Sequence, residues 1–229
     1  MKTLAVILPA YNEDQIIGKV IKQLKQDIKD LKINKKIIVV NDGSSDKTAV
    51  IAKKHGALVL THRINRGLGA ALATGLEYSR RIQADFVITM DSDGQHDSQD
   101  LEKILQPLLK HKADVVVGSR FLNKNNKIPF IRTAILKFAN FVTFLFFGIW
   151  TSDSQSGFRG FNRKAIEKIN LSTNSMEVSS EFYAEVKKHK LKFTEIPIKV
   201  RYTEYSLSKG QQDLNSFNVM LKLIYKLFR

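Results

Sequence analysis

Apolar and polar residues follow two alternating patterns along the first half of the chain. Short apolar or β-branched runs predict strands at 4–8, 36–40, 57–60, 86–90 and 115–117. Between these runs, apolar residues recur at the spacing of amphipathic helices over 16–31, 45–55, 68–81 and 99–110. Alternating strands and helices favour right-handed crossovers, so the pattern predicts an α/β fold: a mostly parallel, Rossmann-like sheet flanked by helices.

The pattern changes after Phe121. An aromatic-rich apolar segment covers Ile131–Trp150, and a Gly- and Ser-rich stretch at 151–160 predicts a loop. Beyond it, the spacing predicts helices at 164–169 and 177–189, a strand at 193–200 and a last helix at 214–229. We find no internal repeat or low-complexity linker, so we expect a single domain.

The longest apolar stretch is too short and too polar to predict a membrane span. It runs from Ala134 to Trp150, contains Lys137 and Asn140, and falls short of the roughly 20 apolar residues that a spanning helix needs. The apolar run at 1–9 lacks the longer core and the cleavage site of a signal peptide. We therefore expect no transmembrane helix.

Composition excludes several classes of protein. With 43% apolar and 26% charged residues in 229, the chain can bury a sizeable core. It has no cysteine, which excludes a disulfide scaffold, a thiolate zinc site, an iron–sulfur cluster and a cysteine nucleophile.

The charge balance predicts an anionic partner. The net charge is +15 and the sequence pI is about 9.9, which suits nucleic acid, membrane phosphates or a phosphorylated substrate. The basic residues are dispersed and match no nucleic-acid-binding module. We therefore expect no nucleic-acid partner; DNA affinity that weakens steeply with salt would contradict this.

Polar clusters follow four of the predicted strands. Because the carboxyl ends of parallel strands meet at one edge of a sheet, these clusters are expected to form a single cleft. They are Pro9-Ala10-Tyr11-Asn12-Glu13, Val40-Asn41-Asp42-Gly43-Ser44, Asp91-Ser92-Asp93-Gly94-Gln95 and Gly118-Ser119-Arg120-Phe121.

The third cluster carries the most specific chemistry. Asp91 and Asp93 are two residues apart, so in an extended segment both carboxylates point the same way. Two close carboxylates repel unless a cation lies between them, and oxygen ligands suit Mg²⁺ or Mn²⁺. A solvated Asp-rich turn is the alternative, but the position directly after a buried strand favours metal binding.

Other candidates are less specific. Asp42 can accept hydrogen bonds from a nucleobase or ribose, or belong to an ordinary Asp-Gly turn. Glu13 can bind ligand or favour a helix N-terminus. The stretch 67–71 imitates part of a dinucleotide-binding fingerprint, but close helix–sheet packing explains it equally well. The five histidines show no metal-ligand spacing, which favours surface or structural roles.

The ordered motifs P-A-Y-N-E, N-D-G-S, N-R-G-L-G-A-A, D-S-D-G-Q-H, G-S-R-F and S-G-F-R-G-F resemble the family 2 glycosyltransferases. Within them the chain is similar to the polyprenyl-phosphate, dolichol-phosphate mannosyltransferase-like branch. The resemblance implies a GT-A fold and inverting transfer of a hexose from a GDP- or UDP-linked sugar to a polyprenyl phosphate. It divides the domain into a nucleotide-sugar-binding half (1–121), an acceptor-binding half (122–213) and a basic amphipathic tail helix (214–229).

The resemblance also assigns roles to residues. The nucleoside and donor would be held by Pro9, Tyr11, Glu13, Asp42, Asp91 and Asp93. The divalent cation would be held by Asp91, Asp93 and Gln95. The catalytic group would comprise Asp153, Arg120 and Arg132, and the acceptor would meet Arg132, Arg201, Ser208 and Lys209.

Three alternatives stay open beside this interpretation. A family 2 enzyme with a soluble acceptor would share the fold and the donor site. A non-catalytic sugar-nucleotide binder would not need the intact Asp91/Asp93 pair, and Asp153 can instead be a loop cap or orient the acceptor. We expect a cytoplasmic enzyme held peripherally on an anionic membrane surface by the segment at 131–150 and the basic tail helix.

Overall fold

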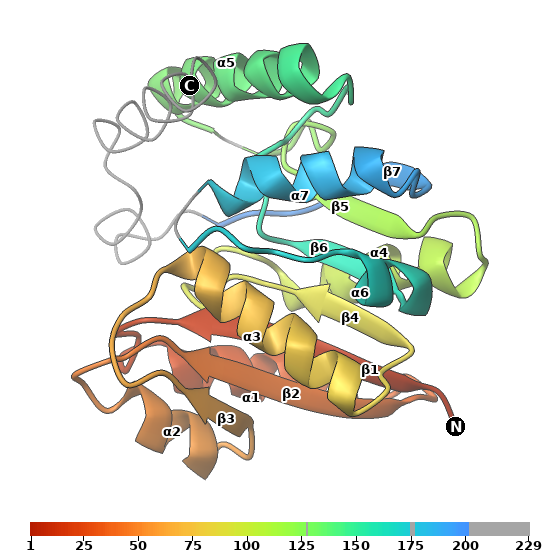
Figure 1. Cartoon of the computed structure of the whole chain (residues 1–229). Helices are drawn as coiled ribbons and strands as arrows, with labels where there is room; N and C mark the ends of the chain where they lie inside the picture. The colour runs from red at the N-terminus through yellow and green to blue at the C-terminus, as the bar shows by residue number, and fades with distance from the viewer. Residues whose placement is uncertain (127, 175–176, 202–229) are drawn as a thin grey trace.

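The computed structural model describes residues 1–126, 128–174 and 177–201 (Figure 1). In this part of the chain, seven strands form one sheet in the order β3-β2-β1-β4-β6-β5-β7. The strands are β1 (Thr3–Ala10), β2 (Asn34–Asn41), β3 (Leu58–Thr61), β4 (Phe86–Thr89), β5 (Val115–Ser119), β6 (Arg159–Asn162) and β7 (Phe193–Pro197).

The sheet is mostly parallel, as predicted, with one antiparallel strand near its centre. Strands β1 to β4 run parallel to one another and β5 runs parallel to β7, whereas β6 is antiparallel to both of its neighbours, β4 and β5. The prediction of a loop over 151–160 was wrong at its end, because Arg159 and Gly160 already belong to β6. A glycine is needed there, since a Cβ on Gly160 would lie 2.4 Å from Ile104 Cγ2.

Helices cover both faces of the sheet (Figure 1). The core on one face contains side chains of α1, α2 and α4, and the core on the other contains those of α3, α6 and α7. The helices are α1 (Ile17–Asp27), α2 (Thr48–Lys54), α3 (Leu68–Arg81), the 3-10 turn η1 (Ser98–Asp100), α4 (Leu101–Leu109), α5 (Phe130–Phe147), α6 (Arg163–Lys168) and α7 (Val178–Lys188).

Helix α3 has the bounds that its apolar spacing predicts, and its glycines serve packing. A Cβ on Gly75 would lie 2.6 Å from Ile7 Cγ2 in the sheet. The amides of Gly69 and Ala70 donate to the Asn174 carbonyl, at 2.8 and 3.3 Å. Because these first amides already have a protein partner, the stretch at 67–71 packs the helix and does not have the open N-terminus of a dinucleotide-binding loop.

Helix α5 lies apart from the sheet, over α7 (Figure 1). Only Leu136 and Thr143 of its residues are buried. Its opposite face exposes large apolar side chains, among them Phe130, Phe141 and Leu145. The 18 residues give a length of about 27 Å and a mean hydropathy of 1.5. Length and composition therefore suffice for a bilayer crossing, so the expectation that this stretch is too short and too polar for one was wrong on that test.

The predicted tail helix at 214–229 lies outside the described residues. The same holds for Ser208 and Lys209. These expectations stay predictions.

Candidate functional site

The four polar clusters meet at one edge of the sheet, as predicted. Strands β1, β2, β4 and β5 all point their carboxyl ends to this edge, because β4 and β5 are each antiparallel to β6 and therefore run the same way. Two clusters are in direct contact, since the Ser92 hydroxyl donates to the Pro9 carbonyl at 2.7 Å. At this edge the chain leaves the paired strands β1 and β4 in opposite directions along the sheet, from β1 towards β2 and from β4 towards β5, and such a point is a common ligand position in α/β folds.

The Asp91–Gln95 loop bends away from the sheet directly after β4. Strand β4 ends at Thr89, so the two carboxylates lie in a bend and not in the extended segment that the sequence predicts. The Asp93 carboxylate accepts a hydrogen bond from the backbone N–H of Gln95 at 2.9 Å. Gly94 has the left-handed φ of 75° that closes the turn. The loop thereby keeps the two carboxylates close enough for the charge of Asp91 to act on Asp93.

His96 and Gly157 fix the position of Asp91. The Asp91 carboxylate, which keeps 37% of its surface exposed, lies 3.0 Å from Nε2 of the buried His96 ring. An ionised carboxylate only accepts hydrogen bonds, so Nε2 carries a proton, while within the described residues the buried Nδ1 of the ring has no hydrogen-bond partner. A Cβ on Gly157 would lie 2.2 Å from Asp91 Oδ1, so only glycine leaves room for the carboxylate there.

The environment separates the pKa values of the two carboxyls. Desolvation opposes ionisation of Asp91, but the His96 hydrogen bond and the charges of Arg120 and Arg159 hold its pKa below the usual range. Desolvation and the negative charge of Asp91 raise the pKa of Asp93 to about 6. The pair therefore has a concentrated negative charge that a cation would relieve.

These residues fit a divalent cation. Asp91, Asp93 and Gln95 offer oxygen donors, which Mg²⁺ and Mn²⁺ prefer, and a histidine that orients a ligating carboxylate is a common supporting contact at metal sites. Within the described residues no group of three or more His, Asp or Glu side chains forms a metal cluster. A divalent cation held by these three side chains would take its remaining ligands from substrate and water.

The affinity for a divalent cation is expected to become weaker as the pH is lowered, because Asp93 is then protonated. Its raised pKa means that the metal-free fold loses stability as the pH rises from about 4, the unfolded value, through about 6. A cation binds the ionised pair, so protons compete with it below about pH 6. Calorimetry with Mn²⁺ should show weaker binding at pH 5 than at pH 7.

The variant Asp93→Asn provides the control. It should bind Mn²⁺ weakly at both pH values, because it removes a ligand and the titrating group together. An affinity of the unaltered protein that is constant from pH 7 to pH 5 would contradict this assignment.

Asp42 is buried and holds the loop that follows β3. Its Oδ1 accepts the Arg66 amide and lies 2.6 Å from His62 Nδ1, and its Oδ2 accepts the Gly67 amide at 2.7 Å. His62 Nε2 in turn lies 2.8 Å from the Thr74 hydroxyl on α3. A carboxylate offers about four lone-pair directions, and these three contacts take up three of them.

The residues after β1 differ in exposure. Tyr11 is half exposed, which suits stacking on a flat ligand, whereas Glu13 is buried. The Glu13 amide donates to the Thr48 hydroxyl at 2.8 Å, and the Asn12 amide donates to the Ser44 hydroxyl at 2.9 Å. The first and second clusters are therefore joined by hydrogen bonds.

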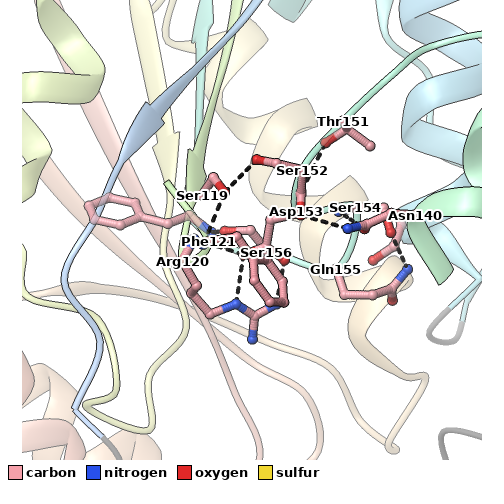
Figure 2. Close-up of polar contacts among 12 residues, drawn as sticks. Ser119, Arg120, Phe121, Asn140, Thr151, Ser152, Asp153, Ser154, Gln155 and Ser156 are labelled. Carbon is pink, nitrogen blue, oxygen red and sulfur yellow. Dashed lines mark hydrogen bonds and ion pairs between the residues drawn. The ribbon is translucent and has the colours of Figure 1, made fainter. Parts of the chain in front are cut away.

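Arg120 and Asp153 form a buried bidentate ion pair (Figure 2). Arg120 Nε and Nη2 donate to the two Asp153 oxygens at 2.7 and 2.6 Å, and the Arg120 amide adds a third bond at 2.9 Å. Asp153 has no exposed surface. In this arrangement its carboxylate orients Arg120, and it is not placed to accept a proton from a ligand.

The segment around Asp153 is held from the sheet. Glu195 on β7 accepts the Ser152 amide at 3.0 Å and the Thr151 hydroxyl at 2.8 Å. The Ser152 hydroxyl lies 2.6 Å from that of Ser119 at the end of β5 (Figure 2). Farther along, Arg159 Nε donates to the Ser156 carbonyl at 2.7 Å. The turn that carries Asp153 and Gly157 is thus fixed between β5, β6 and β7.

The two other predicted arginines lie on separate elements. Arg132 is in the first turn of α5. Arg201 lies against the Asp91–Gln95 loop, because its backbone amide donates to the Gln95 backbone carbonyl at 2.8 Å and its guanidinium donates to Asp97 at 2.9 Å. The structure thus brings Arg201 to the candidate cation site, and the assignment of either arginine to an acceptor stays a prediction.

Four contributors were missed from the sequence. They are His62, His96, Gly157 and Glu195. His96 directly follows a motif residue, so its place in D-S-D-G-Q-H was a usable signal. Gly157 stands in S-G-F-R-G-F, which was a signal of the same kind, although its contact with Asp91 spans 66 positions. His62 and Glu195 reach their partners across 20 and 43 positions, and local spacing gives no sign of such contacts.

Comparison with known proteins supplies the family. The sequence model of Glycosyl transferase family 2 matches residues 5–170. A UDP-N-acetylglucosamine–dolichyl-phosphate N-acetylglucosaminyltransferase of Methanococcus voltae is 33% identical, over 97% of this chain and 95% of its own. A dolichyl-phosphate hexose transferase of Haloferax volcanii is 30% identical, over 86% of this chain and 82% of its own.

A solved structure shares the fold. The glucosyl-3-phosphoglycerate synthase of Mycobacterium tuberculosis, crystallised with Mn²⁺, uridine diphosphate and glucosyl-3-phosphoglycerate, superposes with a TM-score of 0.71. Its sequence is 18% identical, and the match covers 96% of this chain and 79% of that one. The likeness confirms the GT-A type of α/β fold that the sequence predicts.

Proposed function

Since the chain belongs to glycosyl transferase family 2, we propose that it is a metal-dependent enzyme that moves a sugar from a UDP-linked donor to a polyprenyl or dolichyl phosphate at a membrane surface. One observation carries the proposal. The Asp91–Gln95 loop and the buried Arg120–Asp153 pair lie at one sheet edge, joined through the turn at 153–157, and an apolar helix flanks that turn. Two relatives named for transfer to dolichyl phosphate support the acceptor.

The choice of uracil rests on Asp42. With three of its lone-pair directions occupied, the carboxylate can accept one further hydrogen bond. Uracil offers one such donor, its N3–H, whereas guanine offers two neighbouring donors that suit a carboxylate with both oxygens accessible. The relative from Methanococcus voltae is named for a UDP-linked sugar, in agreement with this choice.

The reaction needs positioning more than proton transfer. An oxygen of the acceptor phosphate is already anionic, and it attacks the anomeric carbon of the sugar from the side opposite the leaving group. The bond from that carbon to the diphosphate breaks, its electron pair leaves with the nucleoside diphosphate, and the configuration inverts. No proton has to be removed, so transfer does not need a carboxylate base. An Asp153 that is buried and bound to Arg120 is therefore compatible with catalysis.

The chain's residues would stabilise the separating charges. A divalent cation held by Asp91, Asp93 and Gln95 would neutralise the diphosphate as it departs. Asp153 holds the Arg120 guanidinium in a fixed orientation, so its charge needs no reorganisation during the reaction. We assign Arg120 to the phosphates of the reacting pair, and Arg132 to the acceptor side.

A donor and acceptor screen tests the proposal. The protein is incubated with UDP-glucose, UDP-N-acetylglucosamine or GDP-mannose, with and without a short-chain polyprenyl phosphate, and the lipid product is separated by chromatography. We expect lipid-linked sugar from a UDP-linked donor. Transfer to a saccharide or small molecule, with none to the lipid, would support the soluble-acceptor alternative instead.

The exposed face of α5 is the proposed membrane contact. Phe138, Phe141 and Leu145 are each 45% or more exposed on one side of the helix, while Leu136 and Thr143 pack on the domain. A helix that is bound along one face and apolar on the other suits an interfacial position. The net charge of +15 adds attraction to anionic lipids.

Liposome binding checks this contact. The protein should co-sediment with vesicles of phosphatidylcholine and phosphatidylglycerol at low salt, and Phe141→Glu should lower the binding about tenfold, because a buried Phe contributes about 1.5–3 kcal/mol. Val50→Glu on α2, where Val50 is 67% exposed, is the matched control and should bind as the unaltered protein does. Equal binding by both variants would place the contact elsewhere.

A further inference from the structure

One polar side chain of α5, that of Asn140, makes hydrogen bonds to the backbone of the turn at 152–154. Asn140 Nδ2 donates to the Ser152 carbonyl at 2.6 Å, and Asn140 Oδ1 accepts the Ser154 amide at 2.8 Å (Figure 2). The two contacts settle the orientation of the amide, because a carbonyl needs a donor and an amide needs an acceptor. Asn140 therefore bridges the backbone on both sides of Asp153.

The other polar groups of α5 with known partners behave differently. The Thr133 hydroxyl donates to the Pro129 carbonyl and the Thr143 hydroxyl to the Ala139 carbonyl, one turn earlier in the chain. Asn140 shares the inward side of the helix with Leu136 and Thr143, at spacings of four and three. A side-chain amide in such an apolar helix costs stability unless it is hydrogen-bonded, and here both of its ends are.

The residue between the two contacts is the one that orients Arg120. Asp153 gives its two oxygens to the Arg120 guanidinium, and the backbone on either side of it is bound by Asn140 (Figure 2). Glu195 binds the same turn from β7. The carboxylate of Asp153 is thus positioned from two sides, by the hydrogen bonds of Glu195 on β7 and by those of Asn140 on α5, the helix whose outer face is apolar.

We propose that Asn140 is a positioning residue that couples helix α5 to the Arg120–Asp153 pair. The position of α5 on the domain then determines the orientation of the Arg120 guanidinium. The inference rests on the proposed function, because it gives the apolar helix a part in sugar transfer to a lipid phosphate. It assigns to the helix a second role beside membrane contact. A lipid surface that fixes α5 would also fix Arg120.

A measurement without substrate tests the coupling first. The Arg120 Nε–H is buried and donates at 2.7 Å, so it is expected to give a slowly exchanging signal in a ¹H–¹⁵N spectrum, assigned by its loss in Arg120→Lys. In Asn140→Ala the exchange should be at least about tenfold faster. Thr143→Val, which removes a buried hydroxyl of α5 that does not touch the turn, should exchange as the unaltered protein does.

A kinetic cycle tests the effect on transfer. Asn140→Ala should lower kcat about tenfold with an unchanged KM for the donor, and should lower it less than twofold when Arg120 is already Lys, because the two changes act through one group. Asn140→Asp keeps the acceptor for Ser154 and loses the donor for Ser152, so it should show the same direction and serves if the Ala variant does not fold.

Three results would overturn the proposal. They are unchanged exchange of the Arg120 signal in Asn140→Ala, the same acceleration in Thr143→Val, or an equal loss of kcat in both Arg120 backgrounds. If the unaltered protein transfers no sugar to a lipid phosphate, the proposed function fails, and the exchange measurement still decides whether Asn140 orients Arg120.

Discussion

Replacing Asp91 by Asn is expected to lower the rate of sugar transfer about a thousandfold. The carboxylate is the ionised member of the pair, held so by His96 and by the charges of Arg120 and Arg159. An amide in its place has no charge for a cation and disturbs the contact with His96. Metal stabilisation of a leaving group contributes several kcal/mol, and each 1.4 kcal/mol is about tenfold in rate.

The measurement compares transfer and Mn²⁺ binding in two Asn variants. Asp114→Asn is the control, because Asp114 is also a carboxylate in a hydrogen-bond network, with Asn162, Lys164 and the Lys192 amide, but it precedes β5 at the opposite edge of the sheet. It should lower the melting temperature and leave metal dependence intact. Full activity of Asp91→Asn, or of the unaltered protein in EDTA, would exclude a metal role for this loop.

Gly157→Ala reaches the same site without removing a ligand. The added Cβ would overlap Asp91 Oδ1, at 2.2 Å, and Oδ2, at 2.6 Å, so the carboxylate must move. The backbone of Gly157 is not in the left-handed region, so alanine adds a steric cost at the carboxylate and little backbone strain. We expect Mn²⁺ binding and transfer to fall together in this variant.

Replacing Arg120 by Lys is expected to lower transfer about a hundredfold although the charge is kept. An ammonium offers no planar fork, so the bidentate bonds to Asp153, at 2.6 and 2.7 Å, cannot both form. Because Lys keeps the charge and can still make one bond, the loss of stability should be smaller than the about 3–5 kcal/mol that removing one partner of a buried pair costs. The orientation of the positive charge at the phosphates is lost with the bidentate bonds.

Kinetics below the melting temperature separate the two effects. Arg163→Lys is the matched control, because Arg163 pairs with Asp85 at 3.2 Å on the surface, where its side chain is 47% exposed. An exposed pair contributes about 0–1 kcal/mol, so this variant should keep its rate and its melting temperature. A wild-type rate in folded Arg120→Lys would leave the Arg120–Asp153 pair with a structural role only.

The sequence predicted the elements that repeat a strong pattern. Helix α3 has the bounds Leu68–Arg81 that its apolar spacing indicates, and the clusters after β1, β2, β4 and β5 meet at one edge. Both rest on local regularities, helical periodicity and the common direction of parallel strands. The same reasoning found the Asp91/Asp93 pair, because it directly follows a buried strand.

Strand β6 was missed because its sequence is short and lacks the apolar or β-branched run that predicts a strand. It has four residues, Arg159 to Asn162, with a glycine inside and a buried arginine at its start. Gly160 argues against a strand in the sequence, yet in the structure it is what lets Ile104 of α4 pack against β6. Only the three-dimensional neighbours reveal that reason.

The supporting residues of the site were missed for a related cause. Asp153 and Arg120 were predicted separately, as a catalytic carboxylate and a phosphate ligand, but their bidentate pairing joins residues 33 positions apart. Asn140 was read as an interruption of an apolar stretch. Its two hydrogen bonds to the turn at 152–154 depend on how α5 folds back onto the domain.

The central place of β6 also governs the order in which the chain can fold during synthesis. Strands β4 and β5 leave the ribosome well before β6, which must enter between them, and β5 further waits for β7 at Phe193–Pro197. Until then the nascent chain has strand edges without partners, a state prone to wrong pairing. The turn with Asp153 and Gly157 directly precedes β6, so the middle of the sheet and this part of the candidate site can be completed only after residue 162 has been synthesised.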